Sequence, residues 1–205
     1  MNPETSPPPC LTVISLAARR GERLLFRGLR LTLAPGQALW LRGRNGGGKT
    51  TLLRLLAGLG APDAGEIERC EALFVGHANA MNDDLRAHEA LRFAAALSGL
   101  EPDAAAVDAA LARLGLARQR DAFVRTLSQG QRRRLALARL ALPQTAPLWL
   151  LDEPFDALDD DGLFALQGLL AGHTQRGGSV LLASHQAPPD LMLDTLDLDD
   201  FAVAA

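Results

Sequence analysis

The stretch Gly43-Arg44-Asn45-Gly46-Gly47-Gly48-Lys49-Thr50 decides how this sequence folds. It matches the pattern G-x-x-x-x-G-K-[ST], and it stands between a short apolar segment, residues 37–42, and a leucine-rich segment that begins at Lys49. Glycines let backbone N–H groups turn inward around an anion, and a following helix adds the partial positive charge of its N-terminus. The stretch therefore predicts a strand, a phosphate-binding loop and a helix in succession.

Lysine usage singles out the same stretch. The chain of 205 residues has 20 arginines and one lysine, Lys49. A lysine is a compact charge on a slender stem and can reach the β- and γ-phosphates of a nucleotide, while the Thr50 hydroxyl can bind Mg²⁺. The alternative is a glycine-rich turn that only starts a helix, and the lone lysine argues against it. The expected nucleotide-binding residues are Gly43, Arg44, Asn45, Gly46, Gly47, Gly48, Lys49, Thr50 and Thr51.

A pair of acids follows the apolar segment 148–151. In α/β sheets, ligands bind at the carboxyl ends of the strands, and adjacent side chains of a strand point in opposite directions. We therefore expect different roles for the two carboxylates, with Asp152 orienting Mg²⁺ and Glu153 acting as the general base for water. Taken alone, a strand that ends in two acids is more often a solvated turn. The phosphate loop about 100 residues upstream favours the functional interpretation.

Strand-like and helical segments alternate at both ends of the chain. Residues 83–142 lie between them, are rich in Ala, Leu and Arg with a helical period, and contain breaks that divide them into about four helices. We therefore expect an α/β fold with one domain over residues 10–205, a disordered tail at 1–9 and a helical subdomain inserted at about 78–143. The pattern predicts strands at 11–16, 29–33, 37–42, 72–76, 148–151 and 179–183, helices at 49–59 and 162–171, and a turn at 62–65.

Composition and charge exclude several classes of protein. No uncharged run reaches the ~18 apolar residues that a membrane-spanning helix needs, and the proline-rich N-terminus does not resemble a secretory signal. A net charge of −3 is unlike that of a nucleic-acid-binding protein, so we expect no nucleic-acid partner. Residues 190–205 hold five acids and no base and are expected to form a surface tail. Cys10 and Cys70 are expected to be separate small apolar side chains, which fits a cytosolic compartment.

Three further segments place these motifs in a known order. Leu127-Ser128-Gln129-Gly130-Gln131 resembles the LSGGQ signature of the ABC-type ATPases, with Gln129 in place of the first glycine. Residues 155–159, which end at Asp159, resemble the D-loop of that family, and His185 resembles its switch histidine. The resemblance extends from Leu11 to His185. It implies a P-loop NTPase of ABC type, with a mixed β-sheet core and an inserted α-helical subdomain.

The resemblance also implies a mechanism. ATP and Mg²⁺ bind at the phosphate loop, with Thr50 and Asp152 at the metal, and Glu153 and His185 are the catalytic residues. The ATP-bound protein is a self-dimer, in which a second copy of the chain closes over the nucleotide. The residues of the second copy that contact ATP are those of the signature, namely Ser128, Gln129, Gly130 and Gln131.

The chain is similar to one branch of the family, the ATP-binding subunits of the haem exporters of cytochrome c maturation. That branch has Leu-Phe at the position of Leu25-Phe26, Gly-His at Gly76-His77, two arginines after its signature, here Arg132-Arg133, and Asp-Glu-Pro-Phe at residues 152–155. The similarity implies an ATPase that drives a separate transmembrane permease subunit of a cytochrome c maturation system. It also implies a peripheral location at the cytoplasmic face of the bacterial inner membrane.

Two positions depart from the general pattern of the family. Arg19 and Arg20 stand where an aromatic residue usually stacks on adenine. Arg20 can stack on the base through its guanidinium, or it can be a solvated turn residue. His77 replaces the usual glutamine of the Q-loop, and it either takes over that role or is a strand-end histidine without a ligand. Both alternatives stay open at each position.

The remaining basic residues have simpler interpretations. The run of arginines at 132–134 is expected to be a solvated or interdomain face of a helix. His88 and His173 are expected to be surface residues on helices.

Two other functions compete with that of a transporter subunit. A soluble ABC ATPase of DNA repair or translation usually carries long coiled coils, zinc-binding cysteines or tandem nucleotide domains, which this sequence lacks. A nucleotide-gated binding module with weak hydrolysis is favoured slightly by Gln129, His77 and the missing aromatic. The presence of both Glu153 and His185 argues against such a module.

Overall fold

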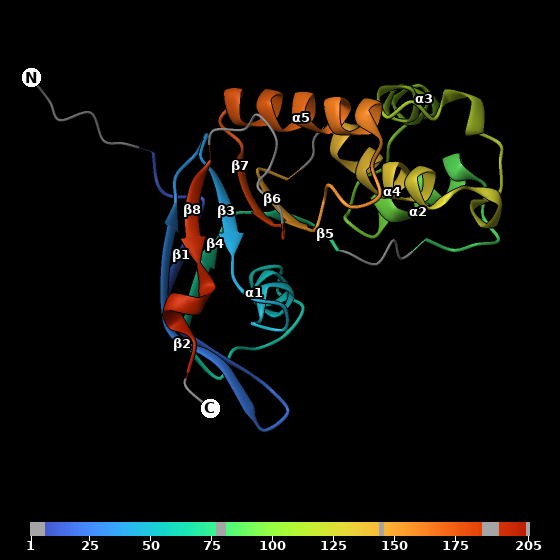
Figure 1. The fold of residues 1–205 in the computed structure, drawn as a ribbon. Helices are drawn as coiled ribbons and strands as arrows, with labels where there is room; N and C mark the ends of the chain where they lie inside the picture. Colours follow the sequence, from blue (N-terminus) through green and yellow to red (C-terminus); the bar gives the residue numbers. More distant parts are fainter. Residues whose placement is uncertain (1–6, 77–80, 144–145, 186–192, 204–205) are drawn as a thin grey trace, which may run out of the picture. The chain divides into compact units, whose positions relative to one another are not determined.

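The computed structural model of the chain describes residues 7–76, 81–143, 146–185 and 193–203 (Figure 1). The chain divides into two compact units. The first consists of Met1–Phe74, Ala146–Asp152 and His173–Ala205, and the second of Val75–Thr145 and Glu153–Gly172. The described residues 7–9 have no regular secondary structure, and residues 1–6 lie outside the described part.

A five-stranded sheet forms the centre of the first unit. Its strands lie in the order β5-β6-β7-β3-β8, and β3 pairs in parallel with both β7 and β8. The strands β6 and β7 are buried along their whole length, as expected for continuous apolar runs in a parallel sheet covered on both faces. The bounds are β3 (Ala38–Arg42), β5 (Ala72–Val75), β6 (Leu148–Asp152), β7 (Ser179–Ala183) and β8 (Asp194–Asp197). The predicted strands at 37–42, 72–76, 148–151 and 179–183 are thus confirmed.

A three-stranded antiparallel sheet completes the β-structure of the first unit. Its order is β2-β1-β4, with β1 at Leu11–Arg20, β2 at Arg23–Leu33 and β4 at Ala64–Arg69. The sequence predicted only a turn at 62–65 and no strand after it. The strand β4 was missed because nearly all of its residues are exposed, so its side chains show no apolar alternation.

One hydrophobic core joins the two sheets to helix α1 (Lys49–Leu56). The helix follows the loop after β3 and packs against β6. Its leucines lie in the same buried cluster as residues from β1, β2, β3, β6 and β7. The core therefore fixes the start of α1 relative to the carboxyl ends of β3 and β6.

Cys10 and Cys70 form a disulfide, and the prediction of two separate side chains is wrong. The two residues are 60 positions apart in the sequence, yet their Cα atoms are 5.2 Å apart. They are brought together because β1 pairs with β4, and the Cys70 N–H donates to the Cys10 carbonyl at 2.9 Å just beyond the paired strands. Since β4 was not predicted, these two cysteines could not be placed side by side from their sequence positions.

The second unit is helical. It contains α2 (Ala87–Ala96), α3 (Ala104–Arg113), α4 (Gln129–Leu137) and most of α5 (Asp160–Gln175), whose last residues belong to the first unit. The Asp103 carboxylate caps α3 by accepting from the Ala106 N–H at 2.7 Å. The helical character predicted for residues 83–142 is confirmed, although part of it takes the form of short 3₁₀ turns. These turns span Ala117–Gln119, Val124–Thr126 and Ala138–Ala141, and a fourth, Leu198–Phe201, follows β8 in the first unit.

His173 is buried, which corrects the expectation of a surface residue. Its ring stacks on the Trp149 ring with 3.7 Å between centroids, and its Nε2 is 3.1 Å from the Pro147 carbonyl oxygen. Burial lowers the pKa of His173 below its usual value, and Arg176 lowers it further, against the opposing effect of the hydrogen bond to Pro147. The ring therefore packs in its neutral form.

This packing predicts a dependence of stability on pH. In the unfolded chain a histidine binds its proton near pH 6.5, whereas the buried ring of His173 binds one only at lower pH. The contribution of His173 to stability is therefore complete above about pH 6.5 and is lost as the pH falls below it, because the unfolded state then binds more protons. We expect the melting temperature of the protein to fall more steeply from pH 7 to pH 5 than that of His173→Gln. Parallel melting curves for the two proteins would contradict this.

Within the part of the chain that the structure describes, no helix has the length and apolar character needed to cross a bilayer.

Candidate active site

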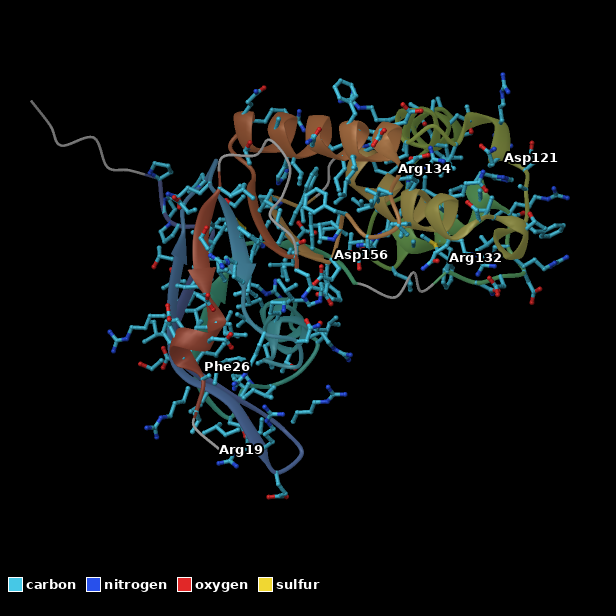
Figure 2. All side chains as sticks on the ribbon, in the orientation of Figure 1. Arg19, Phe26, Asp121, Arg132, Arg134 and Asp156 are labelled. Carbon is cyan, nitrogen blue, oxygen red and sulfur yellow. A yellow bond between two sulfur atoms is a disulfide. The ribbon has the colours of Figure 1, made fainter. Side chains whose placement is uncertain are left out.

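The phosphate loop lies between β3 and α1, as the sequence predicted. Gly48 has a φ of 111°, and a Cβ at this position would lie 3.2 Å from the fully buried Phe26 ring, so glycine is required there (Figure 2). Gly48 also has no side chain with which to cap α1. The first-turn N–H groups of the helix therefore remain available to an anion, next to the positive end of the helix dipole.

Lys49 is held over the loop by backbone carbonyls. Its Nζ donates to the Gly43 carbonyl at 2.7 Å and to the Arg44 carbonyl at 3.3 Å, and the residue is 6% exposed. These bonds keep the ammonium beside the backbone N–H groups that would face a phosphate. A buried charge in this setting is suited to exchanging carbonyl partners for phosphate oxygens.

Thr50 and Asp152 meet at the carboxyl end of the sheet. The Thr50 hydroxyl donates to Asp152 Oδ2 at 2.8 Å, although 102 positions separate the two residues. Asp152 is the last residue of β6 and is 2% exposed. The structure thus brings together a hydroxyl and a carboxylate that the sequence assigned to one metal, and such hard oxygen donors suit Mg²⁺. Thr51, the next residue of α1, is half-buried.

The acidic C-terminal segment contacts the phosphate loop, so the expectation of a surface tail is wrong. The strand β8 pairs with β3, and the 3₁₀ turn after it places the Asp199 carboxylate 2.9 Å from the Arg44 N–H, which donates to it. The Arg44 guanidinium also lies 3.5 Å from Asp199. Asp199 thereby holds the loop through its backbone. No sequence pattern indicates this contact, because 155 positions separate the two residues.

His185 lies just beyond β7, at the same sheet edge as Asp152. The register pairs Asp152 with Ala183, so His185 is two residues past the paired position. The indole Nε1 of Trp40 donates to the Ser184 carbonyl at 3.1 Å and fixes the backbone before the histidine. His185 itself is exposed.

Glu153 begins the segment Glu153–Gly172 of the second unit and has an unusual backbone. Its φ is 48°, in the left-handed region that residues other than glycine seldom adopt, and it is 6% exposed. Its carbonyl oxygen accepts from the Arg133 guanidinium at 2.7 Å and from the Asp156 N–H at 3.3 Å. The side chain predicted to act as the base thus stands on a strained and hydrogen-bonded backbone.

The signature residues form the exposed N-terminus of α4. The Ser128 hydroxyl accepts from the Gln131 N–H at 3.2 Å, and the Gln131 side chain accepts from the Ser128 N–H at 3.0 Å, which is a capping box. Ser128 and Gln129 are exposed. A helix start with exposed polar residues can bind an anion brought by another molecule.

The signature helix is packed against the D-loop segment. A Cβ on Gly130 would lie 2.8 Å from the Ala157 carbonyl oxygen, so only glycine allows this approach. Asp159 caps α5 by accepting from the Gly162 N–H at 3.1 Å, and its carboxylate lies 3.6 Å from the Arg134 guanidinium. Figure 2 shows Arg134 on α4 and Asp156 in the D-loop segment. The signature helix and the D-loop segment are thus in direct contact.

The arginine run at 132–134 was expected to be a solvated or interdomain face, and the structure shows that it is solvated only in part. Arg132 is partly exposed and pairs with Asp83 at 2.8 Å. Arg133, in contrast, is 2% exposed. Sequence reasoning missed Arg133 because a run of three arginines on a helix suggests solvent, and no local signal marks its middle member.

Of the two positions that depart from the family pattern, the structure describes one. Arg20 is the last residue of β1, is exposed and pairs across the hairpin with Arg23. This position is compatible with either interpretation of Arg20. His77 lies outside the described residues.

The sequence profile of the family described as ABC transporter matches residues 26–156, which include the phosphate loop, the signature and the acidic pair. The chain belongs to the ABC transporter family. Its relatives include the cytochrome c biogenesis ATP-binding export protein CcmA 2 of Cupriavidus metallidurans, which is 48% identical over 85% of this chain and 88% of its own length. The CcmA protein of Aromatoleum aromaticum is 47% identical over 95% of this chain and 97% of its own length.

Solved ABC structures share the fold. An ABC transporter ATP-binding protein from Pyrococcus furiosus superposes with a TM-score of 0.80 at 22% identity, covering 94% of this chain and 99% of that one. A metal-chelate-type ABC transporter in an inward-facing conformation gives a TM-score of 0.76 at 28% identity, covering 93% and 80%. The predicted fold, a P-loop NTPase of ABC type, is confirmed.

Family membership also confirms the biochemical class. The chain is an ATP-binding subunit of ABC type and an ATPase, and the transporter interpretation is favoured over a soluble ATPase or a binding module. Membership implies that this ABC ATPase binds ATP, forms dimers and works with a membrane partner.

Proposed function

We propose that this ABC ATPase is the ATP-hydrolysing subunit of a haem exporter of c-type cytochrome maturation, bound peripherally at the cytoplasmic face of the bacterial inner membrane. The observation that carries the proposal is the 43–48% identity to proteins named as cytochrome c biogenesis ATP-binding export proteins. The permease that it drives is a separate transmembrane subunit of the same system.

The phosphate loop binds the triphosphate of ATP through its N–H groups and Lys49. The Thr50 hydroxyl and the Asp152 carboxylate are adjacent oxygen donors, and together they would hold Mg²⁺. When bound, Mg²⁺ neutralises charge that develops on the β- and γ-phosphate oxygens. Asp199 keeps the loop in place by accepting from the Arg44 N–H.

Glu153 is the general base for the attacking water. A carboxylate that accepts the proton as water attacks the γ-phosphate makes the water a better nucleophile. His185 lies just past β7, at the sheet edge where strand-end residues face a ligand. In this proposal it contacts the γ-phosphate side of the site. Water attack, and not group transfer to a second substrate, is the reaction.

The site is completed by a second copy of the chain. Ser128, Gln129, Gly130 and Gln131 of that copy present the N-terminus of α4 to the γ-phosphate in trans. The exposure of Ser128 and Gln129 supports this role. Because ATP is then part of the interface, hydrolysis reopens the dimer, and this cycle moves the permease.

The permease docks on the segment 78–98, which the structure describes from Met81 onward. Two large apolar side chains of this segment are exposed, Phe93 on helix α2 at 56% and Leu97, the residue that follows α2, at 75%. An open groove of about 580 Å³ beside them is lined by Glu89, Arg92, Phe93 and Leu100, among others. Exposed apolar side chains next to charged groups are typical of a protein-binding surface.

A crosslinking experiment checks this docking surface. A photoreactive amino acid placed at Phe93 or Leu97 should crosslink the protein to a membrane subunit in intact cells. The same amino acid at Arg27, an exposed residue of β2, is the matched control and should not. Crosslinks from residues 19–30 in place of α2 would show that the docking surface has been assigned to the wrong element.

Complementation tests the proposed function as a whole. In a bacterium that makes c-type cytochromes and lacks its own copy of this subunit, the parent chain should restore covalent haem attachment, measured by haem staining of cytochromes. Glu153→Gln should fail, and Glu68→Gln, an exposed carboxylate change on β4, should succeed. Normal cytochromes in the deletion strain, or no rescue by the parent chain, would refute the cytochrome c role.

A further inference from the structure

Arg133 is a buried charge placed between two backbone carbonyls. It lies in the middle of α4 and is 2% exposed, whereas its neighbours Arg132 and Arg134 both reach solvent. Its Nη1 donates to the Gly76 carbonyl at 2.8 Å and its Nη2 to the Glu153 carbonyl at 2.7 Å. Burying a guanidinium costs free energy unless its N–H donors are hydrogen-bonded. The burial of Arg133 therefore indicates that these two carbonyls require hydrogen-bond donors.

Of the two carbonyls, that of Glu153 is the one whose orientation bears on the proposed base. The backbone of Glu153 is left-handed at φ 48°, and such a conformation persists only where the surroundings enforce it. The direction of the carbonyl depends on the same backbone angles that aim the side chain. A charge-assisted hydrogen bond at 2.7 Å therefore favours the one backbone conformation in which the Glu153 carboxylate points as the structure has it.

We propose that Arg133 is a positioning residue for Glu153, which holds the general base in its productive orientation through the Glu153 carbonyl. The proposal rests on the proposed role of Glu153 as the base. The second bond of Arg133, to the Gly76 carbonyl, ties the same guanidinium to the end of β5, immediately before His77. In this proposal Arg133 acts on the reaction only through Glu153.

The chain offers a control for the structural cost of losing an arginine that is at least partly buried, namely Arg139. Arg139 lies in the 3₁₀ turn Ala138–Ala141, which directly follows α4. Its guanidinium donates to the Ser98 hydroxyl at 2.8 Å. Ser98 is remote in sequence from Glu153 and has no assigned role in catalysis. Arg139→Gln therefore removes a comparable hydrogen bond of the second unit without touching the Glu153 carbonyl.

The first experiment measures turnover and ATP affinity separately in the full chain. We expect Arg133→Gln to lower kcat by about tenfold or more with the Kd for ATP within about twofold of the parent, because the phosphate loop is untouched. Arg133→Lys, which keeps one charged donor, should recover part of kcat. Arg139→Gln should lower the melting temperature with kcat near that of the parent. If Arg133→Gln does not fold, Arg133→Lys takes its place in the test. The proposal then requires that Arg133→Lys has a lower kcat than the parent and an unchanged Kd for ATP.

The second experiment combines Arg133→Gln with Glu153→Gln and measures single-turnover hydrolysis. If Arg133 acts through the Glu153 carboxylate, the double variant should hydrolyse ATP no more slowly than Glu153→Gln alone. The proposal would be overturned if the rate losses of the two single variants multiplied in the double variant. It would also be overturned if Arg133→Gln kept the parent kcat while Glu153→Gln was inactive. Parent-like hydrolysis by Glu153→Gln is a different failure, because it removes the proposed base itself.

Discussion

Replacing Glu153 with glutamine should lower the rate of ATP hydrolysis by about a hundred- to ten-thousandfold, which is the range for losing a general base. Glutamine keeps the size of the side chain but cannot accept the proton of the attacking water. ATP binding should persist, because Lys49, Thr50 and the loop N–H groups are unchanged. Phosphate release measures the rate, and equilibrium titration with ATP measures the binding.

The matched control for this prediction is Glu68→Gln. Glu68 is an exposed carboxylate on β4, outside the phosphate loop and the signature, so its loss should leave both turnover and binding near those of the parent. If Glu153→Gln hydrolyses ATP at the parent rate, another group is the base. In that event the left-handed backbone of Glu153 serves only the local fold.

Replacing Lys49 with alanine should weaken ATP binding by roughly ten- to a hundredfold, since each charge-assisted hydrogen bond contributes about 1.5–3 kcal/mol. Lys49 is the one lysine of the chain, and in the ligand-free loop its Nζ donates to the Gly43 and Arg44 carbonyls. Alanine removes the charge, and with it the donor that these two carbonyls share. Titration with ATP and phosphate release provide the two measurements.

Arg54→Ala is the control for Lys49→Ala. It removes a positive charge from the same helix, but Arg54 is exposed and faces away from the buried side of α1. Its ATP affinity should stay near that of the parent. Equal losses in the two variants would mean that the overall charge of α1, and not the position of Lys49, determines ATP binding.

The sequence allowed most of the parallel sheet to be predicted, for a physical reason. The strands β3, β6 and β7 are short apolar runs, and burial on both faces requires such composition. The phosphate loop was equally predictable, because glycines, one lysine and a hydroxyl residue stand in fixed order between a strand and a helix. These features are local, so their pattern can be recognised without knowing what lies next to them in space.

The features that were missed all depend on contacts between distant segments. The strand β4 is exposed and held by pairing with β1, and the disulfide of Cys10 with Cys70 follows from that pairing. The bond from the Arg44 N–H to Asp199 spans 155 positions. The acids of residues 190–205 suggested solvent, and nothing in their spacing indicated a strand beside β3.

The residues of the candidate site could be proposed from the sequence, but the contacts that hold them in place could not. Thr50 and Asp152 were assigned to one metal, and the structure places them 2.8 Å apart. Neither the left-handed backbone of Glu153 nor the buried Arg133 that holds its carbonyl could be inferred, because burial of one arginine in a run depends on tertiary packing. The roles of these residues in ATP hydrolysis stay predictions.

The central claim is that ATP closes two copies of this chain around a shared site and that hydrolysis reopens them. Sedimentation velocity of Glu153→Gln with Mg²⁺ tests it most directly, in saturating ATP and in saturating ADP. We predict a dimer in ATP and a monomer in ADP. A Glu153→Gln protein that binds ATP but sediments as a monomer at every ATP concentration would contradict the claim.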